Sequence, residues 1–108
     1  MNSTWVTDMR HFLDDAGTGA ALPDRALRLA VFFGSIIAWV TSGRTIADAR
    51  TNVACRRSPG HRRCLGGILA RLETDGAVVW HCPVCGDNGI TRGWEGTPWD
   101  RRPRSGTR

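Results

Sequence analysis

Four cysteines carry the chemistry that this sequence specifies most sharply, and all of them lie in its C-terminal half, at Cys55, Cys64, Cys82 and Cys85. Zinc binds four protein ligands tetrahedrally, and structural zinc sites are often made of four cysteines. The last pair reads Cys-Pro-Val-Cys-Gly, and two intervening residues let both sulfur atoms face one ion. Gly86 can take the positive φ that carries the backbone beneath a metal. We therefore predict a structural zinc ion held by all four cysteines.

The first pair is the weaker half of this prediction, because eight residues separate Cys55 from Cys64. His61 stands three positions before Cys64 and is an alternative to Cys55 as the fourth ligand. Iron or a small iron–sulfur cluster is an alternative to zinc. A redox pair is disfavoured, because redox Cys-x-x-Cys motifs open a helix and the residues after Cys85, Gly-Asp-Asn-Gly, are a poor helix start. A deaminase site needs a His-x-Glu sequence, which the chain does not contain.

The motifs argue against an enzyme. A zinc ion with four cysteine ligands has no open coordination position for water or substrate. The sequence also has no Ser/His/Asp arrangement, no phosphate-binding loop and no dinucleotide fingerprint. We therefore predict a non-enzymatic binding module with no small-molecule substrate.

The basic residues of this 108-residue chain are fifteen arginines, and their distribution is uneven. Residues 1–49 hold four arginines and five acidic residues, for a net charge of −1, whereas residues 50–108 hold eleven arginines and five acidic residues, for +6. This asymmetry favours an acidic partner, with nucleic acid as the first candidate. The densest positive charge lies between the first two cysteines, at Arg56, Arg57, Arg62 and Arg63.

These four arginines are predicted to contact the phosphates of nucleic acid, because the metal would fix their loop at both ends. The alternative is a solvated loop whose arginines pair with local carboxylates. Trp80, Trp94 and Trp99 could stack on bases. Such residues more often fill the core of a small sheet, and we expect this of Trp80 and Trp94, with Trp99 the most exposed.

The elements that must position these residues are expected to begin with two helices. Trp5, Met9, Phe12 and Leu13 recur at helical spacing and predict a helix over residues 4–15. A second helix is predicted from Pro23 to about Thr41, with Asp24 in its first turn and Gly43 as its stop.

The most apolar stretch of the second helix is residues 29–40, and over residues 31–40 it is apolar nearly all round, so residues 29–40 should be buried on several sides. This apolar stretch has twelve residues, Gly34 and Ser35 included, and is too short to span a membrane, which needs about 20. A protein-interaction or assembly factor that uses residues 29–40 as its interface, as a homodimer or with another protein, is therefore the alternative to nucleic-acid binding.

The C-terminal half reads as a small sheet. Residues 43–54 look like a connector, with a possible helical turn at 46–50. Residues 68–73 and 77–81 flank an Asp-Gly turn and predict a hairpin, and residues 90–94 predict a third strand. The expected fold class is α+β, with two N-terminal helices packed on a zinc-ribbon-like module of about three short antiparallel strands. The expected domains are a helical hairpin over 1–44, that module over 45–100, and a flexible basic tail over 101–108.

Two stretches of the sequence resemble a group of short, uncharacterised bacterial proteins. One runs from Trp80 to Asp100 and combines Cys-Pro-Val-Cys-Gly-Asp-Asn-Gly with later Gly-Trp and Thr-Pro-Trp-Asp segments; the other is Cys55-Arg-Arg-Ser-Pro-Gly-His-Arg-Arg-Cys64. The opening segment, residues 5–14, looks like the start of the same group. The resemblance implies a zinc-ribbon-like fold in a cytoplasmic protein, and it implies no activity. A cytoplasmic location also fits residues 1–5, which lack the cationic and apolar runs of a secretory signal.

Overall fold

The computed structural model of this chain describes residues 4–14, 17, 22–43, 50–58 and 62–103. Its elements combine one α-helix and one short 3-10 helix with a five-stranded sheet. In chain order they are β1 (Thr4–Asp8), η1 (Met9–Phe12), α1 (Asp24–Thr41), β2 (Arg50–Ala54), β3 (Gly67–Leu72), β4 (Val78–His81) and β5 (Asn88–Arg92).

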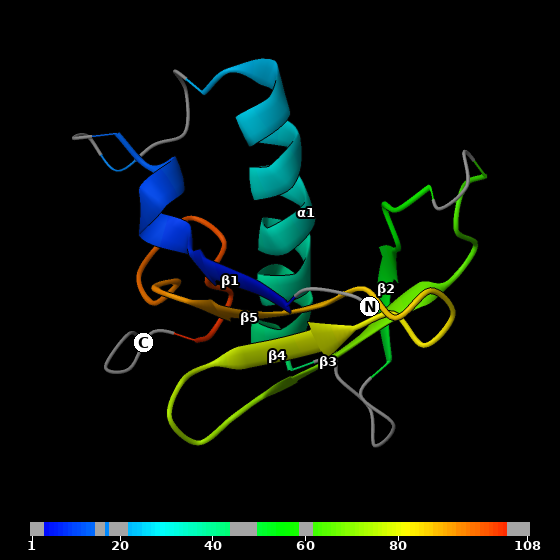
Figure 1. Ribbon diagram of the computed structural model, residues 1–108. Helices are drawn as coiled ribbons and strands as arrows, with labels where there is room; N and C mark the ends of the chain where they lie inside the picture. Colours follow the sequence, from blue (N-terminus) through cyan, green and yellow to red (C-terminus); the bar gives the residue numbers. More distant parts are fainter. Residues whose placement is uncertain (1–3, 15–16, 18–21, 44–49, 59–61, 104–108) are drawn as a thin grey trace.

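The sheet is mixed, with the strand order β1-β5-β4-β3-β2. The N-terminal strand β1 runs parallel to β5, with Val6 opposite Ile90, and the other three strand pairs are antiparallel. Helix α1 lies across one face of this sheet (Figure 1). The strand β1 is therefore an edge strand, which pairs with β5, the last strand among the described residues.

The predicted helix over residues 4–15 is wrong, and with it the fold class of two helices on a three-stranded module. Residues 4–8 form β1, and the helical part is the single 3-10 turn of η1. Trp5, Val6 and Thr7 form an aromatic and β-branched run that suits a strand. Asp8 ends that strand, because its Oδ1 accepts a hydrogen bond from Arg10 N at 2.9 Å and caps η1.

The other predicted elements have mixed outcomes. The predicted second helix is confirmed as α1, and the predicted hairpin as β3 and β4. The predicted third strand exists as β5, two residues earlier than expected. The connector prediction is wrong at its end, because residues 50–54 form the edge strand β2. The predicted helical turn falls mostly on residues 44–49, which lie outside the described residues, as do the predicted domain boundary after residue 44 and the tail residues 104–108.

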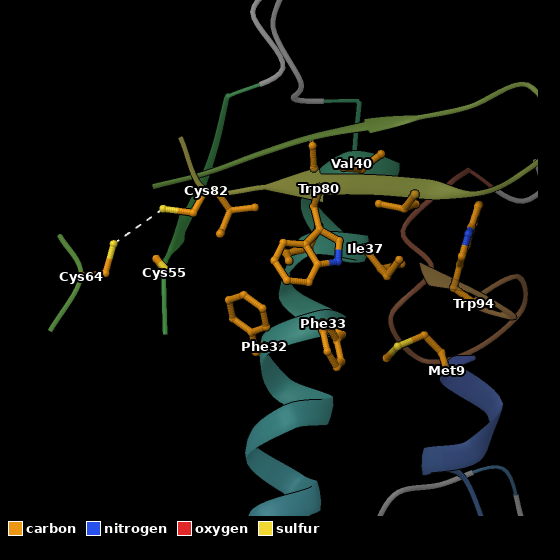
Figure 2. Close-up of a cluster of buried hydrophobic side chains, with 14 residues drawn as sticks. Met9, Phe32, Phe33, Ile37, Val40, Cys55, Cys64, Trp80, Cys82 and Trp94 are labelled. Atoms are coloured by element: carbon orange, nitrogen blue, oxygen red, sulfur yellow. Dashed lines mark hydrogen bonds between the residues drawn. The ribbon is translucent and has the colours of Figure 1, made fainter. Parts of the chain in front are cut away.

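The core lies between α1 and the sheet, and Trp80 of β4 is at its centre (Figure 2). The Trp80 ring meets Phe32 at 5.4 Å between centroids and Phe33 at 5.9 Å. Gly89 on the neighbouring strand leaves room for this indole, since a Cβ there would approach it to 2.5 Å. The prediction that the apolar helix is buried is confirmed for most of residues 29–40, although Val31 and Ser35 face solvent.

The segment after β5 folds back on α1. Trp94 is buried, and its indole N–H donates to Gly76 O at 2.8 Å. Further along, Arg101 N donates to Thr41 Oγ1 at 2.8 Å, at the C-terminal end of α1. Trp99 is half-buried and packs against the core beside Gly34. Among the described residues, no helix is both long and apolar enough to cross a membrane.

Candidate metal centre

The four cysteines that the sequence singles out come together where β2 and β4 end and where β3 and β5 begin. Their sulfur atoms all lie within 4.8 Å of one another. The shortest separations are 3.6 Å between Cys55 Sγ and Cys85 Sγ and 3.7 Å between Cys64 Sγ and Cys82 Sγ. A tetrahedral ion with metal–sulfur bonds of about 2.3 Å separates its sulfur ligands by about 3.8 Å. The four thiols are free rather than paired in disulfides, and they could hold one metal ion.

Two connections, each joining a pair of antiparallel strands, supply two cysteines each. Cys55 follows β2 and Cys64 precedes β3, whereas Cys82 follows β4 and Cys85 precedes β5. In Figure 2, Cys55, Cys64 and Cys82 converge at the side of the core. The strand pairs determine where the cysteines lie, so the site depends on the sheet that carries it.

The long and the short connection are closed in the same way. Cys55 N donates to Gly66 O at 2.9 Å, and Cys82 N donates to Asp87 O at 2.7 Å. The eight-residue connection is tightened by a further bond, from Cys64 N to Arg57 O at 2.8 Å. The spacing that weakened the first pair in the sequence is therefore no obstacle, because both connections end in a pair of strands.

Backbone N–H groups point at every one of the four sulfur atoms. The sulfur of Cys64 accepts from Gly66 N at 3.4 Å. The other sulfur acceptors and their backbone donors are Cys55 with Arg57, Cys82 with Val84 and Cys85, and Cys85 with Asp87. Hydrogen bonds to sulfur favour the thiolate over the thiol, and the thiolate is the form that binds a metal. Gly86 has φ 83°, as the predicted turn beneath the metal requires.

The pKa values of the Cys55 and Cys82 thiols are shifted in opposite directions. Burial raises the pKa of the Cys55 thiol to about 12. Burial also opposes ionisation of Cys82, but the N–H groups of Cys85 and Val84 and the nearby thiols bring its pKa down to about 7. Of these two thiols, Cys82 is therefore the one that ionises more readily. A bound divalent cation would deprotonate the remaining thiols, since metal ligation and proton release are coupled.

A partly buried ion pair joins the two cysteine-bearing connections. Asp87 is 1% exposed, and its Oδ1 lies 3.3 Å from Arg57 Nη1. Its Oδ2 is buried without a hydrogen-bond partner. Asp87 also uses its backbone on both sides, because its N–H reaches Cys85 sulfur and its C=O accepts from Cys82 N. Reasoning from the sequence missed this residue, although an acid two positions after a ligand, in a region rich in arginine, was the available signal.

The four arginines predicted to contact phosphates have different surroundings. Arg57 forms an ion pair with Asp87. The guanidinium of Arg56 lies over the Phe32 ring, 5.9 Å from its centroid. Arg62 and Arg63 are exposed. The alternative ligand His61 lies outside the described residues.

Two of the three tryptophans considered for base stacking are core residues, as predicted. Trp80 and Trp94 are each 1% exposed. Trp99 is half-buried, so the expectation that it would be the most exposed of the three is confirmed. Aromatic stacking on bases therefore has no support from Trp80 or Trp94.

No protein-family model, no curated protein and no solved structure matches this chain. The assignment of a function therefore rests on the four sulfur atoms, on the connections that hold them and on the surface around them.

Proposed function

We propose that this protein is a non-enzymatic zinc-binding module in which Cys55, Cys64, Cys82 and Cys85 hold one structural zinc ion. The observation that carries the proposal is the approach of four sulfur atoms to within 4.8 Å of one another, each with a backbone N–H directed at it. A set of four thiolates in tetrahedral array suits zinc or iron. Zinc is the simpler occupant, because it needs no redox chemistry and fills all four positions.

The role of the ion follows from where the ligands lie. Each pair of ligands sits where a strand ends and the next begins, so one ion ties β2–β3 to β4–β5 at their open ends. Metal-binding energy at such a site is folding energy. A closed set of four ligands also excludes substrate from the metal, which supports binding rather than catalysis as the activity.

Metal analysis of the purified protein tests this proposal. We expect one zinc per chain, released by a strong chelator, and Co²⁺ replacement should give the absorption of a tetrahedral tetrathiolate. Cys55→Ser should lose the metal, which separates Cys55 from His61 as the fourth ligand. Iron in place of zinc, or a Cys55→Ser protein with full zinc content, would overturn the assignment.

Nucleic-acid binding is a second candidate function, and the charge of the C-terminal half favours it. Residues 50–108 carry +6, and Arg62 and Arg63 extend from the cysteine-bearing loop into solvent. Because Arg57 and Arg56 have intramolecular contacts and two tryptophans are buried, the contacts expected are to phosphates rather than bases.

The salt dependence of binding tests this candidate. Affinity for duplex DNA should fall with salt at a log–log slope of about −0.9 for each phosphate contacted. The double variant Arg62→Gln with Arg63→Gln should flatten the slope, and Arg25→Gln with Arg28→Gln, on the exposed side of α1, is the matched control. Absence of binding to DNA and RNA at low salt would eliminate this function and leave the zinc proposal untouched.

A further inference from the structure

Each of the two cysteine-bearing connections carries, next to a cysteine, an apolar side chain that the fold leaves exposed. Leu65, directly after Cys64, is 90% exposed, and Val84, directly before Cys85, is 69% exposed. Pro83 beside Val84 is exposed as well. We name these three residues, with the exposed Arg62 and Arg63, the exposed-loop patch.

The two connections lie against each other at Gly66, next to Leu65. A Cβ on Gly66, the neighbour of Leu65, would come within 2.9 Å of Val84 Cγ2 and 2.6 Å of Cys82 Sγ. Leu65 and Val84 therefore belong to one surface although nineteen positions separate them in the chain. Gly66 permits the approach, because any side chain there would push the two connections apart.

The backbone that presents this patch is fixed before any partner arrives. The N–H of Gly66 bonds to Cys64 sulfur, and the N–H of Val84 bonds to Cys82 sulfur. With zinc bound, the segments that carry Leu65 and Val84 become parts of one rigid centre. Exposed apolar groups on a preorganised backbone lose little conformational entropy on binding, so they are suited to recognition.

The charge around the patch has one sign at the surface. The segment from Cys55 to Cys64 contains four arginines and no acidic residue. Asp87 offers no exposed negative charge, because it is buried against Arg57. A zinc tetrathiolate would itself carry −2, but three of its four cysteines are buried. Arg62 and Arg63 therefore dominate the charge beside Leu65.

We propose that the exposed-loop patch binds an acidic peptide segment of a partner protein. This peptide would place an apolar side chain on Leu65 and Val84. The inference rests on the proposed zinc centre, which holds together the segments that carry Leu65 and Val84. Charge complementarity selects the acidic residues of the peptide, for which the two arginines are partners. The exposed side chains of Leu65 and Val84 favour a peptide over nucleic acid, because a phosphate backbone gains nothing from burying leucine and valine.

Selection from a phage-displayed library of random 12-residue peptides tests the inference with zinc-loaded protein as bait. Enriched peptides should combine aspartate or glutamate with a leucine, isoleucine or phenylalanine. Leu65→Ser with Val84→Ser should weaken binding of a synthetic enriched peptide by at least about tenfold, as expected for central apolar contacts. Val6→Ser is the matched control, because Val6 is 83% exposed on β1 and should leave the affinity unchanged.

The two arginines give an independent readout of the same interaction. Arg62→Gln with Arg63→Gln should weaken the peptide and reduce the salt dependence of its affinity, while zinc content stays at the wild-type value. Failure to enrich acidic–apolar peptides would overturn the inference. The inference would also be overturned if Leu65→Ser with Val84→Ser left the peptide affinity intact. The same would hold if DNA or RNA bound the protein and none of the enriched peptides competed with it. Loss of zinc from the wild type would instead overturn the proposed function.

Discussion

The guanidinium of Arg57 lies 3.3 Å from the carboxylate of Asp87, and this ion pair joins the connection from β2 to β3, which carries Cys55 and Cys64, to the connection from β4 to β5, which carries Cys82 and Cys85. The carboxylate is buried, whereas the Arg57 side chain is 41% exposed. A buried carboxylate is costly unless a cation accompanies it. Arg57 is therefore a structural residue of the metal centre, although the sequence pattern had placed it with the phosphate-binding arginines.

The first prediction concerns this ion pair. Arg57→Gln should lower the stability of the zinc-loaded protein by about 1–3 kcal/mol, because it leaves a buried carboxylate without its cation. Asp87→Asn in the same chain should restore part of that loss, since the carboxylate charge is then absent. Chemical denaturation of the two single variants and the double variant measures the coupling. Arg62→Gln is the control, and equal stability of Arg57→Gln and Arg62→Gln would contradict the structural role.

The metal centre was the part of the molecule most accessible to sequence reasoning. Cys82 and Cys85 form a short, local motif with a glycine at the turn, so their pairing needs no knowledge of the fold. Cys55 and Cys64 could only be inferred as ligands by count, because their approach depends on β2 pairing with β3. The pairing of Asp87 depends on the fold in the same way, since its partner Arg57 lies thirty positions away.

The N-terminal segment was misassigned because two periodicities coexist in it. Met9 and Phe12 do lie on the side that faces the core, as helical spacing predicts. The residues before them pair with β5 from the other end of the chain, at a sequence separation of 84 between Thr4 and Asn88. A parallel partner so far away leaves no local signal, and the five-residue run is too short to decide between strand and helix. The C-terminal hairpin was predictable because its Asp-Gly turn and both strands are contiguous.

The second prediction concerns zinc removal. Chelation should lower backbone amide protection from hydrogen exchange at residues 62–66 and 82–88, because the metal holds these connections in place. Val78 and Trp80 should keep more protection, since they pack on α1 in the core. Hydrogen exchange with mass spectrometry on zinc-loaded and chelated protein measures the difference. Unchanged exchange throughout would show that the ion contributes nothing to the fold.

The third prediction concerns the apolar helix α1. Ile36 is 1% exposed and Ser35 beside it is exposed, so the two positions form a matched pair. Ile36→Asp should cost several kcal/mol, because it leaves an unpaired charge between the helix and the sheet. Ser35→Asp should change stability by about 0.5 kcal/mol or less, as expected of a surface position. Phe33→Asp should behave like Ile36→Asp. Equal melting temperatures for Ile36→Asp and Ser35→Asp would mean that this face of α1 is not in the core.

The fourth prediction concerns Gly34 and Trp99, which hold the C-terminal segment on α1. A Cβ at Gly34 would meet the Trp99 indole at Cγ and Nε1, closer than atoms approach without displacement. Gly34→Ala should therefore destabilise the protein by about 1–3 kcal/mol, as overpacking does. In a Trp99→Ala background the same substitution should stabilise it by about 0.5–1 kcal/mol, because alanine is the better helix former once the indole is gone. Thermal or chemical denaturation of the four proteins measures this reversal of sign. A stabilising Gly34→Ala in the wild-type background would show that Trp99 does not rest on the helix.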